Sequence, residues 1–202
     1  MRRRVWVLAS IVVAAGAALA VVIAILVGGT GGTPPLNAVP ITPPLAAPPT
    51  AGRDSTGNLV SVPEGGRPAL VTFLYAKCTT SCPLIAGEIS AALDEVGPST
   101  AGKIDTVAIS VDPVGDTPAE VNNFLSVHQL TGRMSYIIGS RADLAPLWQA
   151  WGIRAQPTDA IRSTHTALVV LVDRNGQEVG TYAGAIPISV PALAADIRTL
   201  TN

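Results

Sequence analysis

The longest uninterrupted apolar stretch of the chain lies at its beginning. No charged residue occurs between Val5 and Val27. As a helix this stretch would be roughly 35 Å long, enough to cross a hydrocarbon core about 30 Å thick. The cluster Arg2–Arg4 precedes it and no basic cluster follows it, so the positive-inside rule predicts a cytoplasmic N-terminus and an extracytoplasmic remainder. We therefore predict a single-pass membrane anchor over residues 1–27.

A cleaved signal peptide is the alternative interpretation of this segment. Ala18-Leu19-Ala20 resembles a cleavage site. However, the apolar run continues to Val27, whereas the apolar region of a signal peptide is usually about 7–15 residues long. The length favours an uncleaved anchor.

The segment that follows, residues 28–52, combines many prolines with an absence of charge. Its prolines are Pro34, Pro35, Pro40, Pro43, Pro44, Pro48 and Pro49. Such a composition is typical of polyproline II linkers. We predict a tether here, and a single folded domain over residues 53–202.

Within that domain, short apolar or alternating runs alternate with stretches of helical periodicity. Strands are predicted at 58–62, 69–75, 104–111, 135–138, 166–172 and 177–182, and helices at 83–96, 117–128, 141–151 and 189–200. Thr117 is the predicted N-cap of the second of these helices, with Pro118 at its first position. The alternation predicts an α/β fold with a mostly parallel central sheet and helices on both faces. The cysteine pair at the first strand-to-helix turn, Cys78 and Cys82, is the thioredoxin-like placement, and in a fold of that type the sheet is mixed because a later strand runs antiparallel.

The charge of the domain excludes one class of partner. All 14 acidic residues of the chain lie in it, but only 10 of the 13 basic ones, which gives a net charge of −4. Nucleic-acid binding calls for a basic face, so no nucleic-acid partner is expected.

The chemistry of the chain centres on its only two cysteines, Cys78 and Cys82, which follow the apolar strand 69–75. A thiol pair at this junction of strand and helix can cycle between dithiol and disulfide, or bind a thiophilic metal. A purely structural disulfide is the third possibility, because the predicted compartment is oxidising. A bridge across so short a loop would constrain the unfolded chain little, which disfavours that role.

The helix that begins at this pair should favour thiolate. Cys82 is predicted in or beside the first helical turn, where free amides and the helix dipole should lower the pKa of its thiol. Lys77 adds positive charge next to Cys78. Thiolate serves both redox attack and metal binding, so this argument alone does not choose between them.

One of the two histidines offers a third ligand. His165 stands at the head of the strand 166–172. If this strand runs antiparallel to 69–75, as in thioredoxin-like folds, its head points at the cysteine loop. Two thiolates and an imidazole suit Cu(I). A loop histidine without ligand function is the alternative for His165, whereas His128, at a predicted helix end, is interpreted as structural.

Three motifs together resemble the Sco/SenC family of copper chaperones. They are the segment from Phe73 to Pro83 with its two cysteines, Ser110-Val111-Asp112-Pro113 followed by Asp116-Thr117-Pro118, and His165 ahead of Leu171-Val172-Asp173. The chain differs from many members in having Thr79 after the first cysteine and Thr164 before the histidine.

The resemblance implies a thioredoxin-like fold and a copper ion held by Cys78, Cys82 and His165. It further implies a membrane-anchored metallochaperone for the binuclear copper centre of cytochrome c oxidase. The expected partners are the copper-receiving subunit of that oxidase, and another copper carrier or a thiol reductant.

An extracytoplasmic thiol–disulfide oxidoreductase remains the alternative function. Cys78 would attack a partner disulfide and Cys82 would resolve the mixed disulfide. Dedicated oxidoreductases favour two residues between their cysteines, and here there are three. A peroxidase is a weaker candidate, because no arginine lies close in sequence to the pair. The sequence thus favours a non-enzymatic metallochaperone over an enzyme.

Overall fold

The computed structural model describes residues 35–153, 168–183 and 187–202. The chain divides into two compact units, Met1–Pro35 and Leu36–Asn202, and all the described helices and strands belong to the second. The predicted membrane anchor lies outside the described residues. Within those residues, no helix has the length and apolar character needed to cross a membrane.

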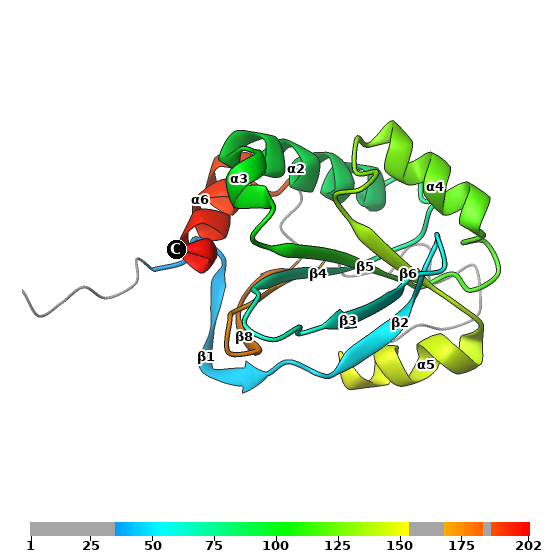
Figure 1. Ribbon diagram of the computed structural model, residues 1–202, viewed down its shortest axis with the longest axis horizontal. Helices are drawn as coiled ribbons and strands as arrows, with labels where there is room; N and C mark the ends of the chain where they lie inside the picture. The colour runs from blue at the N-terminus through cyan, green and yellow to red at the C-terminus, as the bar shows by residue number, and fades with distance from the viewer. Residues whose placement is uncertain (1–34, 154–167, 184–186) are drawn as a thin grey trace, which may run out of the picture. The chain divides into compact units, whose positions relative to one another are not determined.

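A mixed sheet of eight strands forms the centre of the fold (Figure 1). The strands are β1 (Val39–Ala46), β2 (Thr50–Asp54), β3 (Leu59–Val62), β4 (Ala69–Leu74), β5 (Asp105–Ser110), β6 (Ser135–Ile138), β7 (Leu168–Val172) and β8 (Gln177–Ala183). Their order across the sheet is β1-β8-β7-β4-β5-β6-β2-β3. The pairs β4–β5 and β5–β6 are parallel, and every other pair is antiparallel.

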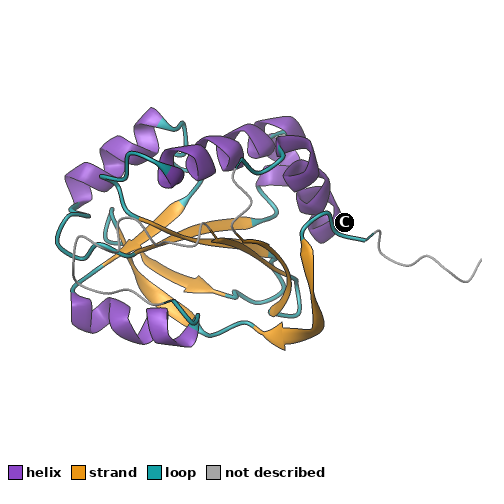
Figure 2. Ribbon diagram, turned by 180° about the vertical axis from the view of Figure 1, so that it is seen from behind, coloured by secondary structure: helices purple, strands orange, loops and turns teal. Residues whose placement is uncertain are grey.

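Helices cover both faces of this sheet, as Figures 1 and 2 show. They are α2 (Ser81–Val96), α3 (Pro98–Ala101), α4 (Pro118–Val127), α5 (Arg141–Ala150) and α6 (Val190–Thr201). The chain advances in one direction through β4, β5 and β6, so right-handed crossovers place α2 and α4 on the same face. It then returns to β7, which places α5 on the opposite face, while α6 packs beside α2. The predicted mixed α/β sheet is confirmed.

Local sequence signals explain where the helices begin. Thr117 caps α4 by accepting a hydrogen bond from the amide of Glu120, as predicted, and Pro118 occupies the first turn. Ser140 and Asp143 form a reciprocal capping box at the start of α5. These caps satisfy amides that would otherwise lack partners.

The core lies between β4 and the helices on each face. All six residues of β4 are buried, as expected of a central strand covered on both sides. Trp148 and Trp151 are buried on the α5 side. The indole of Trp148 donates to the carbonyl of Ser110 at 2.8 Å, and that of Trp151 to Thr50 Oγ1 at 2.6 Å. Both tryptophans are therefore core residues.

The predicted tether over residues 28–52 is wrong for its larger part. Residues 36–52 belong to the folded unit, in which β1 pairs with β8 and β2 pairs with both β3 and β6. The prolines that suggested a tether include Pro40, Pro43 and Pro44 in β1. β1 is an edge strand, so one of its two sides has no neighbouring strand. A proline whose nitrogen faces that side removes no hydrogen bond between strands. The folded domain thus begins at Leu36, and residues 28–34 lie outside the described residues.

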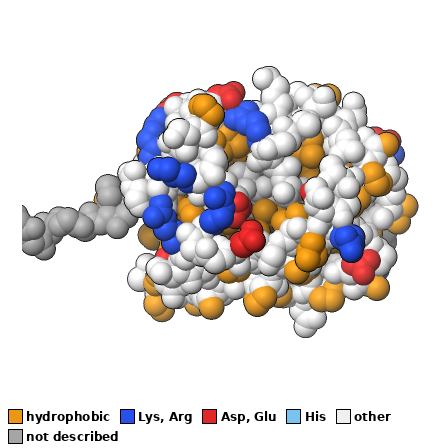
Figure 3. Space-filling model, in the orientation of Figure 1, with side chains coloured by type: hydrophobic (Ala, Val, Ile, Leu, Met, Phe, Trp, Pro, Cys, Tyr) orange, Lys and Arg blue, Asp and Glu red, His pale blue; other side chains and the backbone are white. Residues whose placement is uncertain are grey.

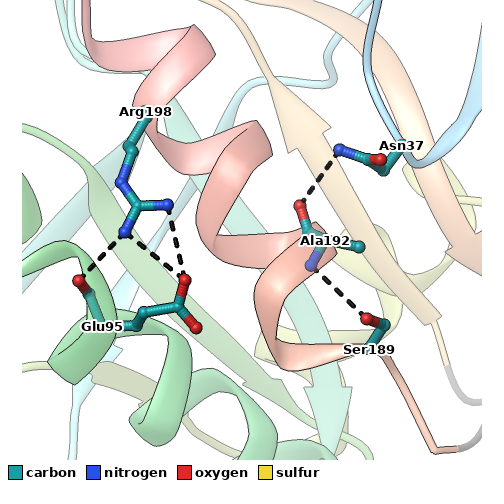
Figure 4. Close-up of polar contacts among 5 residues, drawn as sticks. All are labelled: Asn37, Glu95, Ser189, Ala192 and Arg198. Carbon is teal, nitrogen blue, oxygen red and sulfur yellow. Dashed lines mark hydrogen bonds and ion pairs between the residues drawn. The ribbon is translucent and has the colours of Figure 1, made fainter.

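The start of this domain is fastened to α6, and α6 to α2 (Figure 4). The side-chain amide of Asn37 donates to the carbonyl of Ala192 at 3.4 Å. Ser189 caps α6 by accepting from the amide of Ala192. Arg198 forms an ion pair with Glu95, the guanidinium lying 3.4 Å from the carboxylate. The first strand and the last helix are therefore joined although they lie at opposite ends of the domain's sequence.

Candidate functional site

The two cysteines lie in the connection between β4 and α2, at the carboxyl end of a central strand. β4 ends at Leu74, and α2 begins at Ser81. The amide of Cys78 donates to the carbonyl of Tyr75 at 3.1 Å, which closes a turn directly after the strand. Ligands of open α/β sheets bind outside the carboxyl ends of strands, so the loop occupies the expected position for chemistry.

Cys78 provides the acceptor that the head of α2 lacks. Thr80 stands at the N-cap of this helix but makes no capping hydrogen bond, and the first turn contains no acidic residue. The amide of Cys82 instead donates to Cys78 Sγ at 3.3 Å. Thr80 Oγ1 lies 3.6 Å from the same sulfur, and Ser81 Oγ 4.0 Å. The sulfur of Cys78 thus acts as the cap of the helix.

Both cysteines are free thiols and both are buried, but their surroundings have opposite effects. A hydrogen bond from the Cys82 thiol, followed by the amides of Cys82 and Thr80, lowers the pKa of Cys78 well below its ordinary value, against the effect of burial. The same hydrogen bond and burial raise the pKa of Cys82. Cys78 is therefore the thiolate of the pair and Cys82 its proton donor.

This result corrects the sequence prediction, which assigned the lowered pKa to Cys82. Cys82 does lie in the first turn of α2. However, its amide points to the sulfur of Cys78, so the helix terminus stabilises charge on the first cysteine. The position of a residue in a helix does not tell which side chain its amide faces.

A buried carboxylate, not singled out from the sequence, holds the backbone of the cysteine loop. Asp116 precedes the N-cap of α4 and is only 5% exposed. Its Oδ1 accepts from the amide of Ala76 at 2.7 Å, and its Oδ2 accepts from Ser110 Oγ at 2.6 Å and from the hydroxyl of Tyr136 at 3.1 Å. Burial raises the pKa of Asp116 to about 6, against these hydrogen bonds. The motif Asp-Thr-Pro was visible in the sequence, but nothing in it reveals that the carboxylate is buried.

Tyr136 is one of the hydroxyl donors to this carboxylate. Burial raises the pKa of Tyr136, and the charge of Asp116 raises it further. The hydroxyl is therefore a permanent donor to Asp116. Asp112 accepts from the amides of Val114 and Gly115, so its side chain stabilises the turn after β5.

A second contact links the loop to α4 at the surface. Lys77 Nζ lies 3.3 Å from Glu120 Oε1, and the two side chains are 54% and 42% exposed. Thr79, where many members of the resembled family have proline, is exposed. The cysteine loop is thus held by two contacts: the buried carboxylate of Asp116 binds its backbone, and a solvent-exposed ion pair links Lys77 to Glu120.

The structure brings Cys78 and Cys82 together, but His165 lies outside the described residues. The antiparallel pairing of β7 with β4, on which the prediction of His165 depends, is confirmed. Thr72 Oγ1 donates to the carbonyl of Leu168 at 2.8 Å, so the head of β7 lies beside the end of β4. Among the described residues, no group of three or more His, Cys, Asp or Glu side chains is gathered as in a metal site.

The other histidine is structural, as predicted. His128 stands at the C-cap of α4, and its ring packs on Phe124 with centroids 4.6 Å apart. Burial lowers the pKa of its imidazole.

A large cleft lies apart from the cysteine loop. It has a volume of about 1240 Å³, and it is lined by the β2–β3 hairpin, the start of β5 and the end of α2. In Figure 3 basic and acidic side chains lie together at its margin. The lining residues of the cleft include the ion pairs Arg67–Asp105 and Arg133–Asp94, each at 2.9 Å. Neither cysteine is among its described lining residues, so the chemistry of the thiols does not use this cleft.

Comparison with known proteins agrees with the motifs. The model of the family described as SCO1/SenC matches residues 53–202. The chain belongs to the SCO1/SenC family. No curated protein sequence matches it significantly.

Solved structures of the SCO1/SenC family share the fold. Bradyrhizobium japonicum ScoI, solved with copper bound, is 30% identical, with a TM-score of 0.64 over 76% of this chain and 98% of that one. BsSco, described as a member of the Sco family of cytochrome c oxidase assembly proteins with a disulfide switch, is 18% identical, with a TM-score of 0.66 over 81% and 98%. Yeast Sco1, solved with copper bound, is 18% identical, with a TM-score of 0.61 over 78% and 92%.

Proposed function

We propose that this protein is a membrane-anchored, extracytoplasmic metallochaperone that binds copper as its cargo and assists assembly of the binuclear copper centre of cytochrome c oxidase. The observation that carries the proposal is the sulfur of Cys78 at the head of α2, which accepts from the amide of Cys82, next to the free thiol of Cys82 itself. Membership of a family in which ScoI and yeast Sco1 have been solved with copper supports the choice of metal.

The two thiols are suited to a soft metal ion. Thiolate sulfur selects Cu(I), which accepts low coordination numbers. Cys78 offers its thiolate without prior loss of a proton, whereas Cys82 must release one when it binds. Capture of Cu(I) should therefore release about one proton per chain at neutral pH, and should be blocked when the pair is oxidised to a disulfide.

His165 is the third ligand of the proposed site. The support is topological: Leu168 lies beside the end of β4, and His165 comes three residues before it in the sequence. Residues 1–27 would anchor the protein with its C-terminal domain outside the cytoplasm. The partners would be the copper-receiving subunit of the oxidase, and a copper carrier or thiol reductant that prepares the site.

The asymmetry of the cysteines also favours a second candidate, a thiol–disulfide oxidoreductase. The Cys78 thiolate would attack a partner disulfide and release one partner thiolate. Cys82, after losing its proton, would attack the mixed disulfide and release the second. The partner is reduced to a dithiol, Cys78 and Cys82 are oxidised to a disulfide, and an external thiol reductant must restore them.

Metal analysis of the full-length protein in detergent tests the first candidate against the second. The reduced protein is loaded with Cu(I), beside Cys78→Ser, Cys82→Ser and His165→Ala, with His128→Ala as the matched histidine control. We expect about one copper per chain in the parent and in His128→Ala, and loss or weakening in the other three.

Two outcomes would contradict the proposal. Undiminished Cu(I) affinity in His165→Ala would exclude the imidazole as a ligand. An absence of copper in the parent, together with reduction of a disulfide substrate that requires both cysteines, would establish the oxidoreductase instead.

A further inference from the structure

We propose that Asp116 is the positioning residue of the cysteine loop: it holds the amide of Ala76, and thereby keeps Cys78 Sγ at the head of α2. This inference deepens the proposed function, on which its copper measurement rests. Its redox measurement does not depend on copper.

The first step is the placement of the carboxylate itself. Asp116 is buried, and its Oδ2 accepts from Ser110 at the end of β5 and from Tyr136 in β6. Its own amide donates to the carbonyl of Asp112 at 2.9 Å, and Thr117, the next residue, caps α4. The carboxylate is therefore fixed by two strands and a helix, all of them outside the cysteine loop.

The second step is the bond from this fixed group to the loop. Asp116 Oδ1 accepts from the amide of Ala76 at 2.7 Å, and hydrogen bonds to a charged acceptor are the stronger kind. Ala76 lies inside the turn that closes between Cys78 and Tyr75. The bond therefore sets where the turn lies relative to the end of β4.

The third step connects the turn to the sulfur. Cys78 ends the turn, and its Sγ receives the amide of Cys82 at 3.3 Å. Without the bond to Ala76, the turn is free to shift, and the sulfur loses its fixed distance to that amide. The interaction belongs to the reduced pair, because a sulfur that is bonded to a second sulfur in a disulfide is a poorer hydrogen-bond acceptor for this amide. Loss of Asp116 should thus favour the disulfide.

The fold supplies a matched control for this argument. Asp196 on α6 is also buried and also accepts from a backbone amide, that of Ala38, and from a tyrosine hydroxyl, that of Tyr182. Its contacts lead to the start of the domain instead of the cysteine loop. Replacing Asp196 removes an equivalent set of bonds without touching Ala76.

The test measures two properties of the full-length protein in detergent for Asp116→Ala, Asp116→Asn and Asp196→Ala. The first is the equilibrium between the Cys78–Cys82 dithiol and disulfide in glutathione buffers, and the second is the Cu(I) affinity by chelator competition. For Asp116→Ala we expect a shift of about tenfold toward the disulfide, equivalent to a potential about 30 mV lower, and Cu(I) binding weakened about tenfold.

The conservative variant distinguishes positioning from mere packing. Asp116→Asn keeps an oxygen that can accept from Ala76, so both properties should stay within about threefold of the parent. Asp196→Ala should also leave both properties of the folded protein unchanged, even though it lowers the melting temperature. If Asp116→Ala does not fold, Asp116→Ser replaces it, because serine keeps a buried polar atom but is too short to reach Ala76.

Unchanged redox equilibrium in Asp116→Ala or Asp116→Ser would overturn the inference, and so would an equal shift in Asp196→Ala. If the parent binds no copper, the proposed function fails, but the redox equilibrium still decides the role of Asp116.

Discussion

Asp116 and Asp196 are two buried carboxylates with the same kind of partners in two regions of one domain. Asp116 accepts from the amide of Ala76 and the hydroxyl of Tyr136, and Asp196 from the amide of Ala38 and the hydroxyl of Tyr182. The two carboxylates differ in which part of the chain contains the amide that they bind. Ala76 lies two residues before Cys78, whereas Ala38 lies directly before the edge strand β1. The same bonding pattern thus fastens a reactive loop in one region and the beginning of the fold in the other.

The two carboxylates also differ in what surrounds them. Asp196 accepts two backbone amides, from Asn37 at 2.7 Å and from Ala38 at 2.9 Å, together with the side-chain amide of Asn37 at 2.9 Å. Asp116 accepts one amide and two hydroxyls, and lies near the charge of Asp112. We infer that Asp196 mainly stabilises the fold. Asp116 is costly to bury in its charged form, and its main effect is to position the cysteine loop.

The largest effect in this comparison should come from deleting the strands that Asp196 secures. A chain that begins at Arg53 loses β1 and most of β2, and leaves Asp196 buried without Asn37 and Ala38. It also loses Thr50, which accepts from Trp151. Because domains are stable by only about 5–15 kcal/mol, we expect no cooperative thermal transition for this chain. The control is a chain that begins at Leu36, whose circular dichroism should show one.

If the shorter chain melts cooperatively within about 5 °C of the longer one, residues 36–52 are dispensable. In that case the boundary predicted from the sequence would describe the stable domain better than the sheet does.

Asp196→Ala should have the next largest effect. The substitution leaves the amides of Asn37 and Ala38 and the hydroxyl of Tyr182 without their acceptor. Ala38 and Tyr182 are buried, and each buried group left unpaired costs about 1–3 kcal/mol, so we expect the free energy of unfolding to fall by about 2–5 kcal/mol in urea denaturation. The Cu(I) affinity of the folded fraction should be that of the parent. A loss of less than about 1 kcal/mol would show that water replaces the carboxylate at this site.

The sequence predicted more of the fold than of the bonds that hold the site. Apolar runs such as 69–75 and the cap at Thr117 depend on local patterns, and the structure confirms both. β1 was missed because its prolines are compatible with a strand only at the edge of a sheet, and strand order is not a local property. Asp116 was missed as a functional residue for the same reason, since its partners Ala76 and Tyr136 lie 40 and 20 residues away in the sequence.

The pH dependence of the free energy of unfolding provides a test, with a smaller expected effect, of the cost of burying Asp116. Burial raises its pKa to about 6 in the folded protein, from an ordinary value of 3.8. A carboxyl whose pKa rises on folding contributes stability below its unfolded pKa, and this contribution is lost as the pH rises through the folded pKa. Asparagine does not titrate. The free energy of unfolding of the parent, relative to Asp116→Asn, should therefore fall by on the order of 2–3 kcal/mol between pH 4 and pH 7.

Urea denaturation of both proteins across this pH range measures the difference. Asp143→Asn is the control of opposite sign, because hydrogen bonds from Ser140 lower the pKa of the exposed Asp143. The free energy of unfolding of the parent, relative to Asp143→Asn, should be constant above pH 5 and should fall only at lower pH. If the free energy of unfolding of the parent relative to Asp116→Asn does not change between pH 4 and pH 7, burying the charged carboxylate does not destabilise the fold.

The smallest effect should come from the surface contact that lies closest to the cysteine in sequence. Glu120→Gln removes the ion pair with Lys77, the residue directly before Cys78. Both side chains are substantially solvated, so water replaces the interaction and the free energy of unfolding should change by about 0–1 kcal/mol. The dithiol–disulfide equilibrium should stay within about twofold of the parent at low and at physiological salt.

Glu120→Gln distinguishes between two groups that could hold the cysteine loop in place, Asp116 and Glu120. Ala76 is one residue farther from Cys78 than Lys77, but its partner Asp116 is buried and held by two strands, whereas Glu120 is exposed on α4. If burial determines the coupling, Asp116→Ala shifts the redox equilibrium and Glu120→Gln does not. If Glu120→Gln shifts it as much, and the shift disappears in high salt, the solvated ion pair sets the position of the sulfur and the buried carboxylate serves only the fold.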